Sequence, residues 1–149
     1  MNLVRVRLYI EAPVETVFDA ASDHESFLHT EDGVSAKVVR PGDRERNGLG
    51  CLREVRVGRR ARYLEEITAW EPPVAFEYTI RESSLPLRHA GSRLSFGSRG
   101  SGTEVEWTSR FEVTVPLIGR LLGLVAERLY AASFTKLLRQ TKRRLERRP

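Results

Sequence analysis

The sequence of 149 residues contains one cysteine, Cys51, which excludes an intramolecular disulfide and a zinc site built from cysteines. No run of about 18 apolar residues occurs, because Arg120 and two further charged residues interrupt the most apolar stretch, so no membrane-spanning helix is predicted. The first residues, 1–13, lack the pattern of a signal peptide. We therefore expect a cytoplasmic protein that forms a single domain over residues 1–149.

Catalytic and metal-binding signatures are missing as well. The chain contains no G-x-S-x-G, no H-E-x-x-H and no P-loop motif. Its histidines, His24, His29 and His89, include no pair at the spacing of metal ligands. The sequence thus predicts no catalytic residue, no metal and no cofactor.

The positive charge of the chain is confined to its end. Residues 136–149 hold seven basic residues and one acid, so this stretch carries a charge of +6, and the remainder sums to −1, which gives the net charge of +5. A solvated helix end whose cations suit the helix dipole is the expected role. Nucleic acid is not expected as a partner, because no aromatic residues are interleaved with these cations. Contact with an anionic membrane through this tail is a less favoured alternative, and monomer and homodimer both stay open.

The chain upstream of residue 116 consists of short alternating segments separated by Gly and Pro. In residues 103–113, for example, Val105, Trp107, Ser109 and Phe111 alternate with polar residues, which is typical of a strand with one wet face. The predicted strands cover 4–10, 34–40, 51–57, 62–70, 74–81, 92–96 and 103–113, and two short helices follow the first strand at 13–21 and 22–28.

The last quarter of the chain, 116–149, reads as one long helix. Pro116 suits a first helical position, and no other proline interrupts the run before its end. Two apolar stripes recur at helical spacing, and they comprise Ile118, Leu122, Val125 and Leu129, then Tyr130, Phe134, Leu137 and Leu145. We expect both stripes to face the sheet, with a bend near a glycine or a short preceding helix that packs differently accounting for their offset.

Together these elements predict an α+β protein. Connections of hairpin length imply an antiparallel sheet of about seven strands, which curls and wraps around the long helix. A curled sheet offers more concave surface than one helix fills, so a cavity is expected between them.

Several short runs carry a resemblance to a known family. They are IEAPVETVF at 10–18, GLGCLREV at 48–55, LEEITAWEPP at 64–73 and GTEVEW at 102–107. With the closing helix they resemble the SRPBCC superfamily, the START-like or pollen-allergen-like helix-grip fold, and within it the polyketide cyclase/dehydrase-like branch. The resemblance implies a hydrophobic pocket between sheet and helix, but these motifs are structural and do not identify a ligand.

The inward faces of the predicted strands and the helix near 122–133 give a set of candidate ligand-binding residues. The set comprises Phe18, Phe27, Arg53, Val55, Tyr63, Glu65, Ile67, Phe76, Tyr78, Ile80, His89, Leu94, Phe96, Trp107, Phe111, Leu122, Val125 and Leu129. We expect about half of seven aromatic members to touch a cavity and the others to be plain core, the seven being Phe18, Phe27, Phe76, Tyr78, Phe96, Trp107 and Phe111. Tyr78 and Trp107 each carry a donor that could meet a ligand.

Two polar members of this set leave alternatives open. Arg53 shares the apolar face of its strand and needs a partner there, either Glu65 across the hairpin or the carboxylate of a ligand. A register slip of one residue would replace Glu65 by Glu66. His89 is expected at a loop or strand end, with general acid–base catalysis as its functional alternative.

The favoured hypothesis is binding or transport of a hydrophobic small molecule, lipid-like or polyketide-like, with one polar end. The alternative is an enzyme of the polyketide cyclase/dehydratase type that uses the same pocket. A third hypothesis is an interaction module that uses exposed leucines at 117, 121 and 124, or the basic tail.

Overall fold

A computed structural model describes residues 1–147 of the chain and shows seven strands and three helices. The elements are β1 (Asn2–Ile10), α1 (Val14–Ser22), α2 (His24–Phe27), β2 (Val34–Arg40), β3 (Leu52–Val57), β4 (Ala61–Glu71), β5 (Ala75–Ser83), β6 (Leu87–Arg99), β7 (Gly102–Val113) and α3 (Gly119–Glu146). The predicted α+β class and order of elements are confirmed. The main difference is β6, which begins at Leu87 inside a predicted loop.

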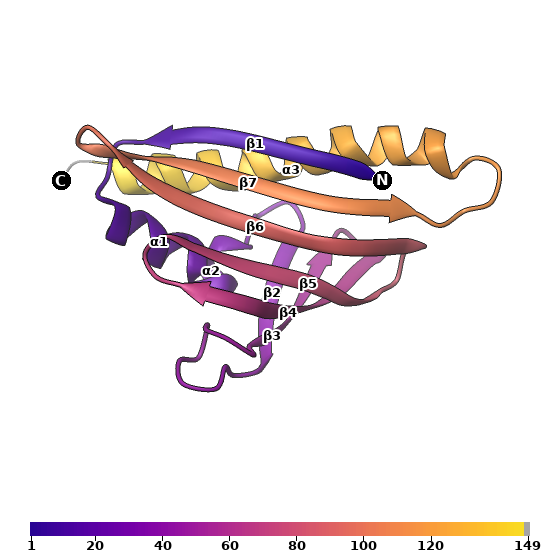
Figure 1. The fold of residues 1–149 in the computed structure, drawn as a ribbon, viewed down its shortest axis with the longest axis horizontal. Helices are drawn as coiled ribbons and strands as arrows, with labels where there is room; N and C mark the ends of the chain where they lie inside the picture. Colours follow the sequence, from indigo (N-terminus) through magenta and orange to yellow (C-terminus); the bar gives the residue numbers. More distant parts are fainter. Residues whose placement is uncertain (148–149) are drawn as a thin grey trace.

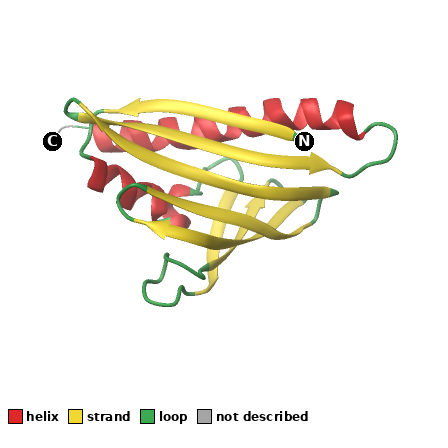
Figure 2. Ribbon diagram, viewed as in Figure 1, coloured by secondary structure: helices red, strands yellow, loops and turns green. Residues whose placement is uncertain are grey.

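All seven strands form one antiparallel sheet in the order β1-β7-β6-β5-β4-β3-β2. Strands β2 to β7 pair with their neighbours in sequence, and β1 closes the order by pairing with β7. Figure 1 shows the sheet curving strongly, with α3 running behind β1 and β7. Helices α1 and α2 lie near the C-terminal end of α3, as the red helices of Figure 2 show. The predicted helix-grip arrangement is therefore confirmed.

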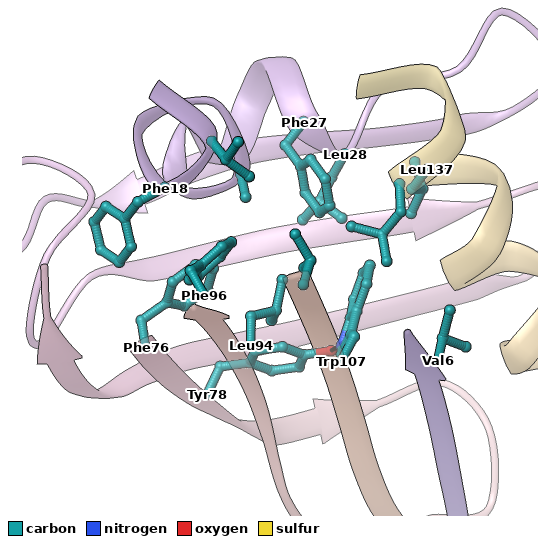
Figure 3. Close-up of a cluster of buried hydrophobic side chains, with 14 of the residues drawn as sticks. Val6, Phe18, Phe27, Leu28, Phe76, Tyr78, Leu94, Phe96, Trp107 and Leu137 are labelled. Atoms are coloured by element: carbon teal, nitrogen blue, oxygen red, sulfur yellow. Dashed lines mark hydrogen bonds between the residues drawn. The ribbon is translucent and has the colours of Figure 1, made fainter. Parts of the chain in front are cut away.

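Alternation along the strands places the core on the concave face of the sheet. In β7, Val105, Trp107 and Phe111 are buried and their neighbours are more exposed, as the period of two requires. Near α1, the ring of Phe18 packs edge-on against those of Phe76 and Phe96, with ring centroids 6.0 and 5.3 Å away (Figure 3). This aromatic cluster fills one end of the space under the sheet and confines any cavity to the other end.

Helix α3 begins later than predicted. Pro116 lies in the connection, and Leu117 has φ of +69°, in the left-handed region that a helix cannot continue through. The helix then starts at Gly119, with Ile118 as its N-cap. Residues 148–149, the end of the predicted helix, lie outside the described residues.

The prediction that Ile118, Val125 and Leu129 face the sheet is wrong. These three side chains are 51%, 48% and 66% exposed. The buried residues of α3 are Gly123, Leu137, Leu138 and Thr141, whereas Tyr130 and Phe134 pack against the core from a partly buried position. Helix α3 approaches β1 closely at Gly123, where a Cβ would clash with the side-chain amide of Asn2, so a larger residue would require that side chain to move.

Candidate functional site

A cavity of about 70 Å³ lies between the concave face of the sheet and the middle of α3. Strands β2 to β7 and the α3 residues 130–137 provide most of its walls. Nine of the eighteen residues predicted from the sequence line this cavity, namely Arg53, Val55, Tyr63, Glu65, Tyr78, Ile80, His89, Trp107 and Phe111.

The other nine predicted residues lie elsewhere. Six of them belong to the buried core without lining the cavity, namely Phe18, Phe27, Ile67, Phe76, Leu94 and Phe96. Leu122, Val125 and Leu129 do not line it either, because α3 turns a different face to the sheet than the one predicted. Three of the seven aromatic residues weighed as core or pocket touch the cavity, namely Tyr78, Trp107 and Phe111.

Nine lining residues were not in the predicted set, namely Leu28, Val34, Val57, Leu87, Ser109, Tyr130, Ser133, Phe134 and Leu137. Ser109 follows from strand alternation, which places it inward beside Trp107 and Phe111. The helix residues follow from the second apolar stripe of α3 rather than the first. Among the helix residues that line the cavity, the polar Ser133 is the one whose inward position no sequence pattern predicts.

A buried ionic network forms one wall of the cavity. Arg53 on β3 lies opposite Glu65 on β4 and is 2% exposed. Its Nε and Nη2 lie 2.9 and 2.8 Å from Oε1 of Glu65. Its Nη1 donates to Nδ1 of His24 at 2.8 Å, and its guanidinium lies over the ring of Tyr78, 4.5 Å from the centroid. The register therefore selects Glu65 over Glu66, which instead pairs with Arg81.

The hydrogen bonds of His24 fix its tautomer. Nε2 lies 2.9 Å from the carbonyl oxygen of Asn47, which can only accept, so this nitrogen carries the hydrogen. Nδ1 then accepts from Arg53 and His24 is neutral. Burial, and after it the Arg53 charge, holds the pKa of His24 well below its ordinary value. Three of the five N–H groups of Arg53 thus face Glu65 or His24.

Glu65 keeps one oxygen free on the cavity side. Both contacts from Arg53 use Oε1, and none of residues 1–147 donates a hydrogen bond to Oε2. Burial raises the pKa of the Glu65 carboxyl, and the charge and hydrogen bond of Arg53 oppose that rise. An anionic group in the cavity would therefore meet the lone pairs of Glu65 as well as an already paired Arg53.

A second polar network, made of hydrogen-bonded side chains, crosses strands β5 to β7. The backbone N–H of Ile80 donates to Nδ1 of His89 at 3.0 Å, so in the neutral ring Nε2 carries the hydrogen. Nε2 lies 2.8 Å from Oγ of Ser92 and 3.2 Å from Oγ of Ser109. Ser92 donates in turn to Ser109 at 2.8 Å. Within residues 1–147 no group accepts the hydroxyl hydrogen of Ser109, which leaves that hydrogen as a donor at the cavity.

This second network also corrects the expectation that His89 lies at a loop or strand end. The residue lies within β6, beside an irregularity in its pairing with β7, and not at a loop or strand end. Its Nδ1 lone pair is already used by Ile80, so neutral His89 offers a donor and no free base. Trp107 is corrected in the same way, because its Nε1 donates to the hydroxyl of Tyr78 at 3.1 Å (Figure 3).

One further contact ties α3 to the sheet across the cavity. The hydroxyls of Tyr63 on β4 and Tyr130 on α3 lie 3.0 Å apart. Burial raises the pKa of both phenols, so both are protonated and one can donate to the other. A ligand that enlarges the cavity must stretch or break this hydrogen bond.

The partly buried His89 makes stability depend on pH. Burial lowers the pKa of His89 to about 4, below the value of about 6.5 in an unfolded chain. The unfolded state therefore binds the proton first, and stability is lost as the pH falls from about 6.5 to about 4. We expect the stability advantage of the wild type over a His89→Gln variant to be about 2 kcal/mol smaller at pH 5 than at pH 7, measured by urea unfolding.

His29 provides the control for this measurement, because it is exposed. The difference between the wild type and a His29→Gln variant should change much less over the same pH range. An advantage of wild type over His89→Gln that stays constant between pH 7 and pH 5 would contradict a lowered pKa for the partly buried His89.

Within residues 1–147, no group of three or more His, Cys, Asp or Glu side chains is placed to hold a metal ion. No helix in this range combines the length and apolar character needed to span a bilayer.

Comparisons with known proteins agree with this geometry. Among solved structures, TTHA0849 from Thermus thermophilus superposes with a TM-score of 0.76 at 27% identity, over 96% of both chains. A START superfamily protein from Mycobacterium smegmatis gives a TM-score of 0.77 at 14% identity, over 97% of this chain and 99% of that one. Ara h 8.0201 gives 0.64 at 16% identity, over 91% and 97%. No curated protein sequence matches the chain.

The last two of these structures show a shared fold, and they agree with the resemblance to START-like and allergen-like proteins, which is confirmed. A family model covers nearly the whole sequence and adds the closer relationship. Because that model, described as polyketide cyclase/dehydrase and lipid transport, matches residues 1–146, the chain belongs to this family of the SRPBCC superfamily.

Proposed function

We propose that the chain binds a hydrophobic small molecule in the cavity between α3 and the sheet, and that the polar end of this molecule is uncharged. The observation that carries the proposal is the pair of polar networks in an otherwise apolar cavity. One network ends in a free donor at Ser109, and the other pairs Arg53 with the charge of Glu65 and with the acceptor Nδ1 of His24. The family description, which includes lipid transport, supports an apolar ligand.

The state of Arg53 is the reason to expect an uncharged ligand. A carboxylate at this guanidinium would either displace Glu65 or His24 or lie beside the negative charge of Glu65. Displaced Glu65 would remain as a buried and unpaired charge, which costs several kcal/mol, about 3–5 when one partner of a buried pair is removed. A carbonyl or ester oxygen can instead accept from Ser109 and leave the network intact.

The size of the cavity implies that α3 moves when a ligand binds. The cavity of about 70 Å³ is well below the volume of about 300–1,000 Å³ typical of ligand pockets. Helix α3 packs chiefly on β1 and β7, so its side facing β3 to β5 can open with the smallest loss of contacts. The hydrogen bond between Tyr63 and Tyr130 is the contact expected to break.

The alternative of a polyketide cyclase/dehydratase-type enzyme would use the same cavity. Proton transfer there needs a group with a free lone pair and a suitable pKa. Neutral His89 uses its lone pair on Ile80. Glu65 keeps a free oxygen, but the charge and the hydrogen bond of Arg53 oppose the rise in its pKa and so make it a weaker base. We therefore favour binding over catalysis for this chain.

A matched pair of ligands tests the proposal. Dodecanoic acid and its methyl ester share one apolar chain and differ in the charge of the polar end. We expect the ester to displace a fluorescent apolar dye from the protein at lower concentration than the acid. A Ser109→Ala variant should bind the ester about 2- to 10-fold more weakly, the effect of one hydrogen bond.

Ser98 supplies the control, since it lies on β6 but is exposed and outside the cavity. A Ser98→Ala variant should bind the ester like the wild type. Tighter binding of the acid, or equal loss in both serine variants, would contradict an uncharged polar end held by Ser109.

A further inference from the structure

The first half of α3 exposes a continuous row of large aliphatic side chains. Leu117 is fully exposed, and Leu121, Leu124 and Leu129 are 63%, 59% and 66% exposed. Leu117 directly precedes the helix, and at 100° per residue Leu121, Leu124 and Leu129 share an arc of about 140° on the exposed side of α3. Single exposed aliphatic residues are ordinary, but a contiguous row on one element marks a surface that another molecule covers.

The backbone conformation just before α3 directs the first leucine of this row, Leu117, into solvent. Leu117 adopts φ of +69°, a conformation that is unfavourable for a leucine and puts its side chain fully into solvent. A leucine in this conformation gains nothing from the fold by its side chain. Strain of this kind is found where a surface has a role other than stability.

Cations continue the same side of the helix toward its other end. Leu121 is followed at helical spacing by Arg128, Ala132, Arg139 and Arg143, all of them exposed. We call the exposed side of α3 from residue 117 to residue 143 the outer face. It is apolar in its first half and basic in its second half.

The acids of the helix are directed away from the outer face. Glu127 accepts a hydrogen bond from Nδ2 of Asn2 at 2.7 Å, so it turns toward β1. Glu146 accepts from Nζ of Lys142 at 2.6 Å and from the backbone N–H of Glu11 at 2.8 Å. Within the described part of α3, the charges presented on the outer face are therefore positive.

We propose that the outer face docks on the surface of an anionic lipid bilayer. The leucines would enter the boundary between headgroups and acyl chains, and Arg128, Arg139 and Arg143 would lie among anionic headgroups, as in amphipathic helices that bind parallel to a membrane. The charge pattern decides against a second copy of the chain. A two-fold contact along the whole outer face would set its cations against either the cations or the leucines of the other copy, with no acids on that face to pair with them.

Docking would also bring the cavity next to the bilayer. A surface hollow beside the outer face is lined by residues of α3 and of the segments 30–34 and 57–58. It shares Val34, Val57, Ser133 and Leu137 with the lining of the cavity, so these four side chains separate the cavity from the surface. Lys136 closes part of this hollow through its ion pair with Asp32. The inference stands without any ligand in the cavity, so its failure would leave the proposed function untouched.

Vesicle co-sedimentation of the full chain tests the inference. We expect binding to vesicles of phosphatidylcholine with phosphatidylserine at low ionic strength, weaker binding at physiological salt, and much weaker binding to pure phosphatidylcholine. An Arg139→Gln/Arg143→Gln variant should lose about 5-fold in affinity for each cation, about 25-fold in total. A Leu121→Gln/Leu124→Gln variant should also lose binding, and it should fold because both side chains are exposed.

Matched variants on other surfaces control both effects. Lys37→Gln/Arg44→Gln removes two exposed cations outside α3, and Leu49→Gln/Val74→Gln removes two exposed aliphatic side chains. Both controls should bind vesicles like the wild type. Three results would overturn the inference: no binding to anionic vesicles at low salt, equal binding to neutral vesicles, or a dimer in sedimentation velocity that the Leu121→Gln/Leu124→Gln variant dissociates.

Discussion

Replacing Arg53 by methionine is expected to lower the free energy of unfolding by about 3–5 kcal/mol, the usual cost of removing one partner of a buried ion pair. The variant leaves Glu65 charged and unpaired and removes the donor to Nδ1 of His24. Urea unfolding at neutral pH measures the loss. The same substitution at Arg81, whose pair with Glu66 is largely exposed, should cost no more than about 1 kcal/mol.

A double variant separates the ion pair from the packing around it. Arg53→Met/Glu65→Leu removes both charges together and should recover most of the stability that Arg53→Met loses, because an apolar replacement of a buried pair is often neutral. A double variant as unstable as the single one would show that the lost stability comes from the packing of Arg53 on Tyr78 and not from the unpaired carboxylate.

Trp107→Ala is expected to cost a similar amount, about 3–5 kcal/mol, as for other large aromatic truncations in a core. The indole is 2% exposed and stacks on the ring of Phe134, with ring centroids 3.9 Å apart, so it joins α3 to the sheet. Although the ring lines the cavity, its other contacts are those of a core residue. Urea unfolding measures the loss.

Trp107→Phe refines this result. It keeps an aromatic ring against Phe134 but removes the hydrogen bond to Tyr78, and it should cost clearly less than alanine. A loss well below about 3 kcal/mol for Trp107→Ala would mean that the ring borders open space rather than packed side chains.

The sheet and the ionic pair could be predicted because strand alternation is a local signal. The inward position of Arg53 and Glu65 follows from the parity of each strand, and the hairpin between β3 and β4 then sets them opposite each other. The partner His24 could not be predicted, because it comes from a short helix whose placement on β3 depends on the whole fold. No local pattern distinguishes it from His29.

The orientation of α3 shows a second limit of local signals. Apolar residues occupy nearly every side of its first half, so the helical period alone does not decide which side is buried. The packing of α3 on β1 and β7, which includes the close approach of Gly123 to Asn2, makes that choice, and these contacts join distant parts of the chain. Leu129, which was predicted to face the sheet, thereby joins the exposed Leu117, Leu121 and Leu124 in the apolar half of the outer face.

The two tryptophans allow the most direct test of the proposed cavity. Trp107 lines it, whereas Trp70 does not and donates to Glu45 at the surface. In isotope-labelled protein each indole N–H gives its own signal in a two-dimensional NMR spectrum. On titration with methyl dodecanoate we expect the Trp107 signal to move, with the signal of Trp70 unchanged. Movement of Trp70 alone, or of neither signal while the ester binds, would show that the ligand does not occupy the cavity between α3 and the sheet.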